Sequence, residues 1–203
     1  MRDEKRALRQ ALRDRRKALS PDVVGAAGAA AYVLLRAFPP YQAAASIAAY
    51  IPDENEVPTA QVIEDVARSG RVLSLPRTGQ LAGFVRWRPG DPLVVGPGGV
   101  WQPSAGVPEQ LAAPAMVLLP VVAWDRTGAR LGRGAGFYDR VLADLDDTLV
   151  RIGLAYEFQE VPELPRDPWD VLLHYVITER CIVRCEHHGV ARPAPLQKGG
   201  LQL

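Results

Sequence analysis

The chain has 203 residues, of which 48% are hydrophobic and 23% are charged, and these proportions are typical of globular proteins. No uninterrupted apolar run approaches the ~18 residues of a membrane span. The charged N-terminus does not lead into the hydrophobic segment of a signal peptide. We therefore expect a cytoplasmic protein with no membrane partner.

The net charge of +1 is unevenly distributed along the chain. Residues 1–17 hold eight basic and three acidic residues, which gives them a net charge of +5, and the rest of the chain carries −4. A basic segment on an acidic body indicates an anionic partner, although a solvated, salt-bridged helix face is an alternative. Nucleic acid would need aromatic residues interleaved with the basic ones to stack bases. This segment has no such series, so we expect no nucleic-acid partner.

Two helices are predicted at the start of the chain. Residues 4–18 form an amphipathic pattern with a narrow apolar stripe made of Leu8, Ala11, Leu12 and Leu19. Basic side chains align on another face, namely Lys5, Arg9, Arg13 and Arg16. Ser20 and Pro21 then form a helix start signal, and an alanine-rich helix extends to about Ala37. Pro39 and Pro40 are expected to end it.

The middle of the chain alternates between strand and helix patterns. Strands are predicted at Ala45–Ile51, at Val72–Leu75 and at Phe84–Trp87, with a helix at Pro58–Ser69. Met116–Trp124 is fully apolar, as expected for a strand buried on both faces of a mainly parallel sheet.

The last third continues this alternation. We predict a helix at Tyr138–Leu145 and strands at Arg151–Ala155 and Tyr175–Val183. Strands that alternate with helices indicate an α/β fold, here a single three-layer α/β/α domain with a mainly parallel sheet and a basic N-terminal helix. We expect this domain to span residues 1–186 and residues 187–203 to be a disordered tail.

Cys181 and Cys185 precede His187 and His188, which raises the possibility of a zinc site. In a continuous strand, residues four apart lie ~13 Å apart on one face. That separation is too large for two thiolates to bind one zinc ion at ~2.3 Å. We therefore expect two buried free thiols, which are consistent with a reducing compartment.

The segment from Arg130 to Asp139 has glycine at every second position, Gly132, Gly134 and Gly136. Glycines between a strand and a helix, flanked by Arg130 and Arg133, form a backbone suited to an anion such as phosphate. The spacing matches neither the dinucleotide fingerprint nor the Walker pattern. A plain glycine-rich surface turn is the alternative.

Polar residues follow three of the predicted strands. Glu56 follows the first, Arg77 follows the second, and the glycine-rich segment follows Met116–Trp124. Ligands of such sheets bind beyond the carboxyl ends of the strands. We therefore expect an acid, a base and a phosphate-binding loop at one edge.

Taken in order, these segments resemble the 5-formyltetrahydrofolate cyclo-ligase family over nearly the whole chain, up to about Glu179. The block D-R-T-G-A-R-L-G-R-G-A-G-F-Y-D-R at 125–140 is highly specific for it. The other matching elements are K-x-x-x-R at 5–9, I-P-D-E-N-E-V at 51–57, L-P-R at 75–77, G-L-A-Y-E-F-Q-E-V-P-E-L-P at 153–165, W-D-V at 169–171 and V-I-T-E at 176–179.

The resemblance implies an enzyme, expected to be monomeric, that converts 5-formyltetrahydrofolate to 5,10-methenyltetrahydrofolate. It uses ATP and Mg²⁺, passes through a phosphorylated formyl group, and releases ADP and phosphate. The implied ATP-binding residues are Lys5, Arg9, Arg130, Leu131, Gly132, Arg133, Gly134, Ala135, Gly136, Phe137 and Tyr138. The implied folate-binding residues are Ile51, Glu56, Arg133, Gly134, Ala135, Gly136 and Phe137. Arg133 and Tyr138 would be catalytic, and Asp139 and Asp170 would bind Mg²⁺.

The chain departs from the family pattern at three positions. Ala135, Phe137 and Trp169 stand where lysine, tyrosine and histidine are frequent. Phe84, Trp87 and Trp101 are candidates for stacking on the pterin. Two other functions remain open, a sugar-phosphate isomerase or CoA-transferase on a related sheet, and a nucleic-acid-binding module that uses the basic helix.

Overall fold

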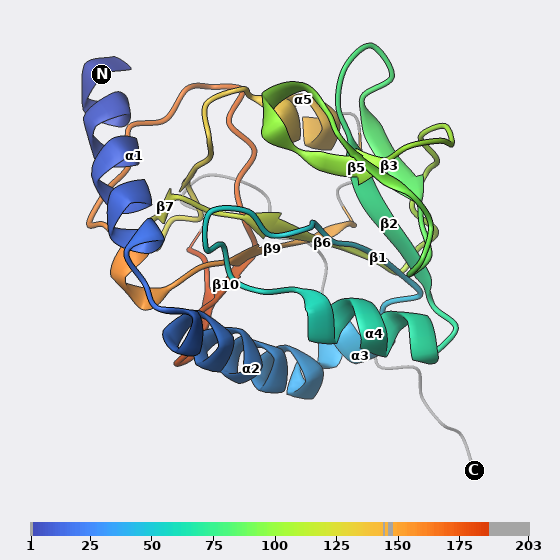
Figure 1. Ribbon diagram of the computed structural model, residues 1–203. Coiled ribbons are helices and arrows are strands. Elements are labelled where there is room, and N and C mark those ends of the chain that lie inside the picture. The colour runs from blue at the N-terminus through green and yellow to red at the C-terminus, as the bar shows by residue number, and fades with distance from the viewer. Residues whose placement is uncertain (1, 144, 146–147, 187–203) are drawn as a thin grey trace.

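The computed structural model of the protein describes residues 2–143, 145 and 148–186 (Figure 1). The expected disordered tail at 187–203 lies outside these residues and stays a prediction, as does the single-domain boundary at residue 186.

A seven-stranded sheet forms the centre of the molecule (Figure 1). Its order is β11 (Ile182–Arg184), β10 (Tyr175–Ile177), β9 (Val150–Leu154), β6 (Ala115–Pro120), β1 (Ser46–Ala48), β2 (Val72–Arg77) and β3 (Gly83–Arg86). All pairs from β10 to β2 are parallel, while the edge strands β11 and β3 pair antiparallel. The prediction of a mainly parallel sheet is confirmed.

Helices and a hairpin cover the two faces of this sheet. On one side lie α2 (Pro21–Ala37), α3 (Pro39–Ala43) and α4 (Ala60–Arg68) (Figure 1). On the other lie α5 (Phe137–Ala143) and a hairpin of β4 (Leu93–Val95) and β5 (Trp101–Pro103), joined by the 3-10 turn η1 (Pro97–Gly99). A second 3-10 turn, η2 (Glu157–Gln159), follows β9. The predicted three-layer α/β/α arrangement is therefore present.

The start of α2 follows its sequence signals. The Ser20 hydroxyl accepts a hydrogen bond from the Val23 amide at 3.4 Å, and Pro21 occupies the first turn. Ala27, Ala31 and Leu35 then point into the core with exposures of 4% or less. This apolar stripe fixes α2 against the sheet.

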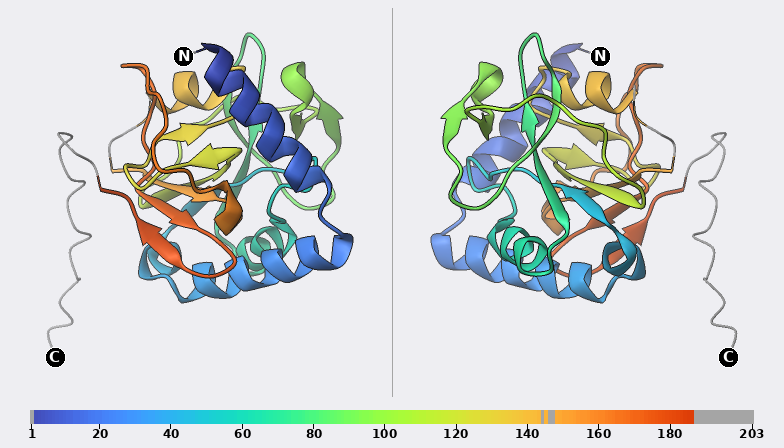
Figure 2. Two further views of the ribbon diagram at one scale, coloured as in Figure 1. Left: turned by 90° about the vertical axis from the view of Figure 1, so that its left-hand side faces the viewer. Right: turned by 90° about the vertical axis from the view of Figure 1, so that its right-hand side faces the viewer.

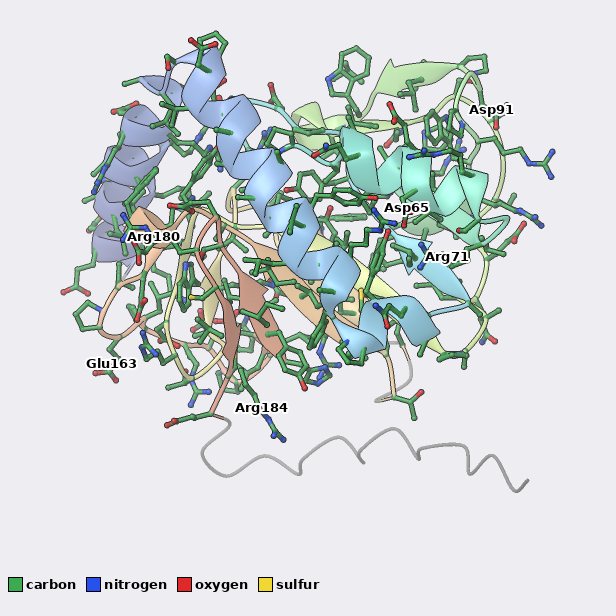
Figure 3. The ribbon with its side chains drawn as sticks, turned by 90° about the horizontal axis from the view of Figure 1, so that it is seen from below. Asp65, Arg71, Asp91, Glu163, Arg180 and Arg184 are labelled. Carbon is green, nitrogen blue, oxygen red and sulfur yellow. The ribbon has the colours of Figure 1, made fainter. Side chains whose placement is uncertain are left out.

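An ion pair ties α4 to β2 on the helical side, as Figure 3 shows from below. The Arg71 guanidinium lies 2.7 Å from the Asp65 carboxylate and 4.5 Å from the ring centroid of Tyr41. The Tyr41 hydroxyl donates to the same carboxylate at 2.7 Å. These contacts hold the helical layer together on the side of the sheet covered by α2, α3 and α4.

The N-terminal helix α1 (Arg2–Lys17) lies beside the carboxyl ends of the parallel strands (Figure 2). Its apolar residues Leu8 and Leu12 belong to a small cluster with Val122, Leu131 and Leu172. This packing places the basic residues of α1 next to the loops that follow β1 and β6.

Met116–Trp124 is not one strand, so that prediction is wrong. β6 ends at Pro120, and β7 (Ala123–Trp124) pairs antiparallel with β8 (Arg130–Leu131). Proline lacks an amide donor and therefore interrupts the ladder of a sheet. The glycine-rich segment accordingly follows β8 of this small hairpin rather than β6.

The prediction of one strand at Tyr175–Val183 is also wrong. The chain turns between β10 and β11, where the Thr178 hydroxyl accepts hydrogen bonds from the amides of Arg180 and Cys181 at 3.1 and 3.2 Å. Cys181 and Cys185 directly flank β11, so the segment between them is extended and the distance argument against a zinc site keeps its basis.

The two cysteines differ in exposure, since Cys181 is exposed and Cys185 is buried. The expectation of a buried thiol is thus wrong for Cys181. Among the described residues, no three His, Cys, Asp or Glu side chains gather as a metal site, and His187 and His188 lie outside them.

Within the part of the chain that the structure describes, no single helix has the length and apolar character needed to cross a membrane. Helices α1 and α2 meet those criteria of length and composition only when taken together, and they are bent by 103° relative to each other.

Candidate active site

A cavity of about 460 Å³ opens between α1, the loops after β1 and the glycine-rich segment. All of the site residues proposed from the sequence line it, namely Lys5, Arg9, Ile51, Glu56, Arg130, Leu131, Gly132, Arg133, Gly134, Ala135, Gly136, Phe137, Tyr138, Asp139 and Asp170. These residues come from four separate regions of the chain, and the fold brings them together at one edge of the sheet.

The glycine-rich segment, residues 132–136, forms one wall of the cavity and is called the glycine loop below. Gly134 and Gly136 adopt left-handed backbone conformations, with φ of +103° and +61°. The Arg9 guanidinium donates to the Gly132 carbonyl at 2.8 Å, and a Cβ at Gly134 would lie 3.4 Å from Arg9 Cζ. Glycine thus provides both the unusual backbone and the close approach to α1.

Three ion pairs lie in the part of the cavity next to this loop. Lys5 Nζ lies 2.9 Å from Asp167 Oδ2 and 3.6 Å from Asp170 Oδ2. Arg130 Nη2 lies 2.7 Å from Asp139 Oδ1, which also accepts a hydrogen bond from the Val171 amide at 3.2 Å. This part of the cavity therefore combines lysine and arginine side chains, which can attract phosphate, with aspartate side chains, which can attract a metal ion.

The fit of Mg²⁺ to these carboxylates depends on their number and setting. Asp139 and Asp170 line the same cavity and are partly exposed, with 21% and 23% of their side chains accessible. Mg²⁺ is usually bound by one or two carboxylates, together with water and substrate phosphate oxygens. Two carboxylates beside the glycine loop match this kind of Mg²⁺ site. A Mg²⁺ site made of protein ligands alone would need additional protein oxygen ligands.

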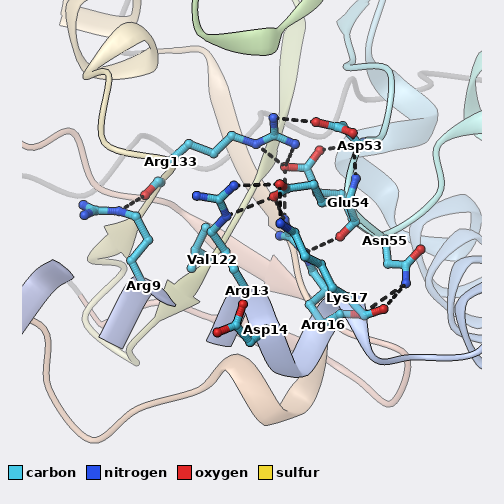
Figure 4. Close-up of polar contacts among 12 residues, drawn as sticks. Arg9, Arg13, Asp14, Arg16, Lys17, Asp53, Glu54, Asn55, Val122 and Arg133 are labelled. Atoms are coloured by element: carbon cyan, nitrogen blue, oxygen red, sulfur yellow. Dashed lines mark hydrogen bonds and ion pairs between the residues drawn. The ribbon is translucent and has the colours of Figure 1, made fainter. Parts of the chain in front are cut away.

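The cavity is also lined by the nearly buried carboxylate of Glu56, which is 4% exposed. Arg133 Nε and Nη2 both lie 3.1 Å from Glu56 Oε1, and the Asp53 amide donates to Oε2 at 3.1 Å (Figure 4). Burial raises the pKa of Glu56, and the nearby charges of Arg133 and Arg16 oppose that rise.

The aromatic residues of the glycine loop region have different settings. Phe137 is 8% exposed and packs in the core, edge to face with Tyr138 at 4.9 Å between ring centroids. Burial raises the pKa of Tyr138 above its ordinary value, so its hydroxyl stays protonated at neutral pH and is available as a hydrogen-bond donor. Leu131 is 5% exposed and mainly packs under α1.

Two expectations about the surroundings of the site are wrong. Arg77 donates to the Gly106 carbonyl at 2.7 Å and is not among the described residues that line the cavity. Phe84 and Trp87 are 2% and 7% exposed and belong to the core, so neither is placed to stack on a ligand there. Trp101, in contrast, is 38% exposed and lines the cavity from the β4–β5 hairpin.

Arg16 is a third correction. Its spacing predicts a basic face shared with Lys5, Arg9 and Arg13, yet its side chain is 1% exposed. A signal was present, since Arg16 lies four residues after Leu12 and eight after Leu8 and therefore continues their buried stripe. Asp53 and Asp167 line the cavity as well and were also missed.

The model of the 5-formyltetrahydrofolate cyclo-ligase family matches residues 1–179. The chain belongs to this family. Every residue that lines the cavity lies within the matched range.

Individual members of the cyclo-ligase family are similar over most of their length. The 5-formyltetrahydrofolate cyclo-ligase of Escherichia coli is 32% identical over 175 residues, covering 82% of this chain and 96% of the relative. That of Haemophilus influenzae is 33% identical over 141 residues, with coverage of 66% and 75%.

Solved structures of this group share the fold. The structure of Aquifex aeolicus 5,10-methenyltetrahydrofolate synthetase matches with a TM-score of 0.76 and 28% identity, over 96% of this chain and 98% of the other. The synthetase from Mycoplasma pneumoniae matches with a TM-score of 0.69 and 25% identity, over 87% and 99%.

Proposed function

We propose that the protein converts 5-formyltetrahydrofolate to 5,10-methenyltetrahydrofolate in a reaction that consumes ATP and requires Mg²⁺. One observation carries this proposal. A single cavity is lined both by a cationic glycine loop and by the nearly buried carboxylate of Glu56. Such a cavity brings a phosphate donor and a folate side by side, and the names of the relatives support this pair of substrates.

ATP phosphates would bind at the glycine loop. Its backbone approaches α1 closely, so that amide groups and the side chains of Lys5 and Arg9 surround an anion. Asp139 and Asp170 are the residues that would hold Mg²⁺, which neutralises phosphate charge when bound.

The folate would bind at the opposite end, against Ile51 and Glu56. The pterin ring presents N–H donors along one edge, and an ionised carboxylate accepts two such hydrogen bonds. Glu56 Oε1 already binds Arg133, which carries a positive charge at the boundary between the two ends.

The chemistry follows from the poor leaving ability of an amide oxygen. The formyl oxygen attacks the terminal phosphorus of ATP, and the bond from that phosphorus to ADP breaks. The neighbouring folate nitrogen then attacks the formyl carbon and loses its proton, and the carbon–oxygen bond breaks to release phosphate. Phosphoryl transfer depends mainly on alignment and on neutralising charge, which Arg133 and the glycine loop amides would provide. Tyr138 would donate a hydrogen bond to the transferring group.

The direct experiment follows the absorbance of the methenyl product after purified protein is mixed with 5-formyltetrahydrofolate, ATP and Mg²⁺. Product is expected only when all three are present. A sugar-phosphate isomerase or a CoA-transferase would form no product and hydrolyse no ATP in response to the folate.

The nucleic-acid alternative depends on the basic charge of α1. In the structure Lys5 pairs with Asp167, while Arg13 and Lys17 pair with Glu54, so these charges face acids of the same chain. Binding of nucleic acid that weakens steeply with salt would favour that alternative. The expected state, a cytoplasmic monomer, stays a prediction.

A further inference from the structure

Arg16 lies under the loop that carries Glu56, and it connects three parts of the fold (Figure 4). Its Nε donates to the Glu54 carbonyl at 2.9 Å, and its Nη1 donates to the Val121 carbonyl at 3.2 Å. One guanidinium of α1 is thus fixed to the loop after β1 and to the residue that follows β6. At 1% exposure this side chain is sealed from solvent.

The third nitrogen of the guanidinium points at carboxylates. Arg16 Nη2 lies 3.7 Å from Glu56 Oε1 and 3.7 Å from Glu54 Oε2, and it has no hydrogen-bond partner among the described residues. Glu56 Oε1 therefore faces two cations, Arg133 at 3.1 Å and Arg16 at 3.7 Å. Because a buried guanidinium is costly unless its charge is compensated, an apolar residue would serve packing alone better.

The loop above Arg16 holds an uncommon backbone. Glu54 and Asn55 are consecutive non-glycine residues with φ of +50° and +57°. Such residues keep a left-handed conformation only where the surroundings determine it. Here Arg16 donates a hydrogen bond to the Glu54 carbonyl. The side-chain nitrogen Nδ2 of Asn55 lies 3.1–3.2 Å from the carbonyl oxygens of Arg16, Lys17 and Leu19. The direction of Glu56, the next residue, follows from this arrangement.

We propose that Arg16 is a positioning residue for the folate, which holds Glu56 ionised and aimed into the cavity from the side opposite Arg133. Arg16 itself does not line the cavity and contacts no substrate. The inference rests on the proposed function, since it assigns Glu56 to folate binding.

The charged and titratable groups around Glu56 define what a pH experiment reports. They are Arg16 from α1, Arg133 from the glycine loop, Asp53 from its own loop, and the tyrosines Tyr50, Tyr138 and Tyr156. The tyrosines stay neutral, because burial raises the pKa of each. Removal of Arg16 leaves Arg133 as the one nearby cation among these groups, so the pKa of Glu56 rises further.

The test measures the dissociation constant of 5-formyltetrahydrofolate without ATP, from about pH 5 to pH 8.5, for the wild type and three variants. Arg16→Met removes the charge, and Arg16→Lys keeps it. Arg13→Met is the matched control, because Arg13 binds Glu54 at 2.7 Å on the partly exposed side of the same helix. We expect Arg16→Met to move the pH at which folate binding is lost upward by ~1 unit. Arg16→Lys and Arg13→Met are expected to leave it near the wild-type value.

A loss of affinity that is equal in Arg16→Met and Arg13→Met, with an unchanged pH profile, would overturn the role of Arg16 and leave the proposed function standing. Wild-type protein that binds no folate would overturn the proposed function itself. If Arg16→Met does not fold, the neutral Arg16→Gln takes its place, both alone and combined with Glu56→Gln. A residue that acts through Glu56 adds no further loss to Glu56→Gln, whereas an independent, additive loss would contradict the inference.

Discussion

The two loops that close the ends of the cavity both contain left-handed backbone, yet they hold it by different means. In the loop that carries Glu56, residues 53–56, Glu54 and Asn55 adopt positive φ and are fixed by hydrogen bonds with α1. In the glycine loop, Gly134 and Gly136 adopt positive φ without side chains of their own. The first arrangement fixes the loop that carries a carboxylate, and the second brings glycine backbone close to α1 at the wall of the cavity.

This difference separates the tasks of the two ends. The loop that carries Glu56 is held by the buried side chains of Arg16 and Glu56, so substitutions there should change stability and the proposed folate affinity. The glycine loop is exposed at Gly134 and Ala135, so substitutions there and at the neighbouring acids should act mainly on phosphate binding and turnover.

The largest expected effect is the loss of turnover in Asp139→Asn. Asp139 lies shortly after the glycine loop in the chain. The amide keeps the shape of the side chain but removes a charge proposed to hold Mg²⁺. We expect kcat of the folded protein to fall at least about hundredfold, while the weakened ion pair with Arg130 lowers the unfolding midpoint. Steady-state kinetics at several Mg²⁺ concentrations measure this effect. The exposed Asp14→Asn in α1 is the control, and near-normal turnover of folded Asp139→Asn would exclude Asp139 as a metal ligand.

Asn55→Ala should act mainly on stability, in contrast to Asp139→Asn. It removes the amide that caps three carbonyls at the end of α1 and places alanine at a φ of +57°. We expect the free energy of unfolding to fall by about 2 kcal/mol, as measured by urea denaturation. Asn55→Gly relieves the backbone and should lose about half as much. Equal losses in the two variants would assign the whole loss to the side-chain amide contacts and none to the left-handed backbone.

Gly134→Ala tests the role of the glycine loop. A Cβ there would sit at a φ of +103° and 3.4 Å from Arg9 Cζ, which disturbs the contact between the loop and α1. We expect the KM for ATP to rise about tenfold, with the KM for folate nearly unchanged. Gly25→Ala in α2 is the control, because a Cβ at Gly25 meets no atom within 4 Å. A rise in both KM values would contradict the separation of the two ends.

The smallest effect concerns Glu54, whose carboxylate binds Arg13 and Lys17. The hydrogen bond from Arg13, the largest cause, and the contact with Lys17 lower the pKa of Glu54 to about 2. A lowered folded-state pKa stabilises the protein above the ordinary value of 4.5, and this contribution is lost as the pH falls towards 2.

Glu54→Gln should therefore be less stable than the wild type by about 1 kcal/mol at pH 7, and this difference should shrink towards pH 2. Unfolding midpoints at a series of pH values measure it. Glu64→Gln, on an exposed part of α4, should show no such trend. A difference that does not change with pH would assign the effect to packing rather than to charge.

Much of the fold could be predicted because its signals are local. Ser20 and Pro21 mark the start of α2, and the apolar stripe of α1 is visible in the spacing of Leu8 and Leu12. The predictions of single strands at Met116–Trp124 and at Tyr175–Val183 are wrong for a common reason. Residues beyond Pro120, and those on both sides of the turn at Thr178, keep the apolar pattern of the strands before them.

The lining of the cavity could be proposed from the family motifs, and the structure places all of those residues there. The hydrogen bonds and ion pairs that these side chains and their neighbours form could not be predicted. The burial of Arg16 depends on the loop that follows β1 and on residue Val121, which are distant in sequence. Arg77 likewise ends a strand at the correct edge but turns toward Gly106.

The central claim, that the cavity aligns the terminal phosphate of ATP with the formyl oxygen, is tested most directly by isotope transfer. 5-Formyltetrahydrofolate with an ¹⁸O-labelled formyl group is converted with ATP and Mg²⁺, and the released phosphate is analysed by mass spectrometry. The account predicts one labelled oxygen in each phosphate formed. Product formation with unlabelled phosphate would contradict it, because the formyl oxygen would then have left without being phosphorylated.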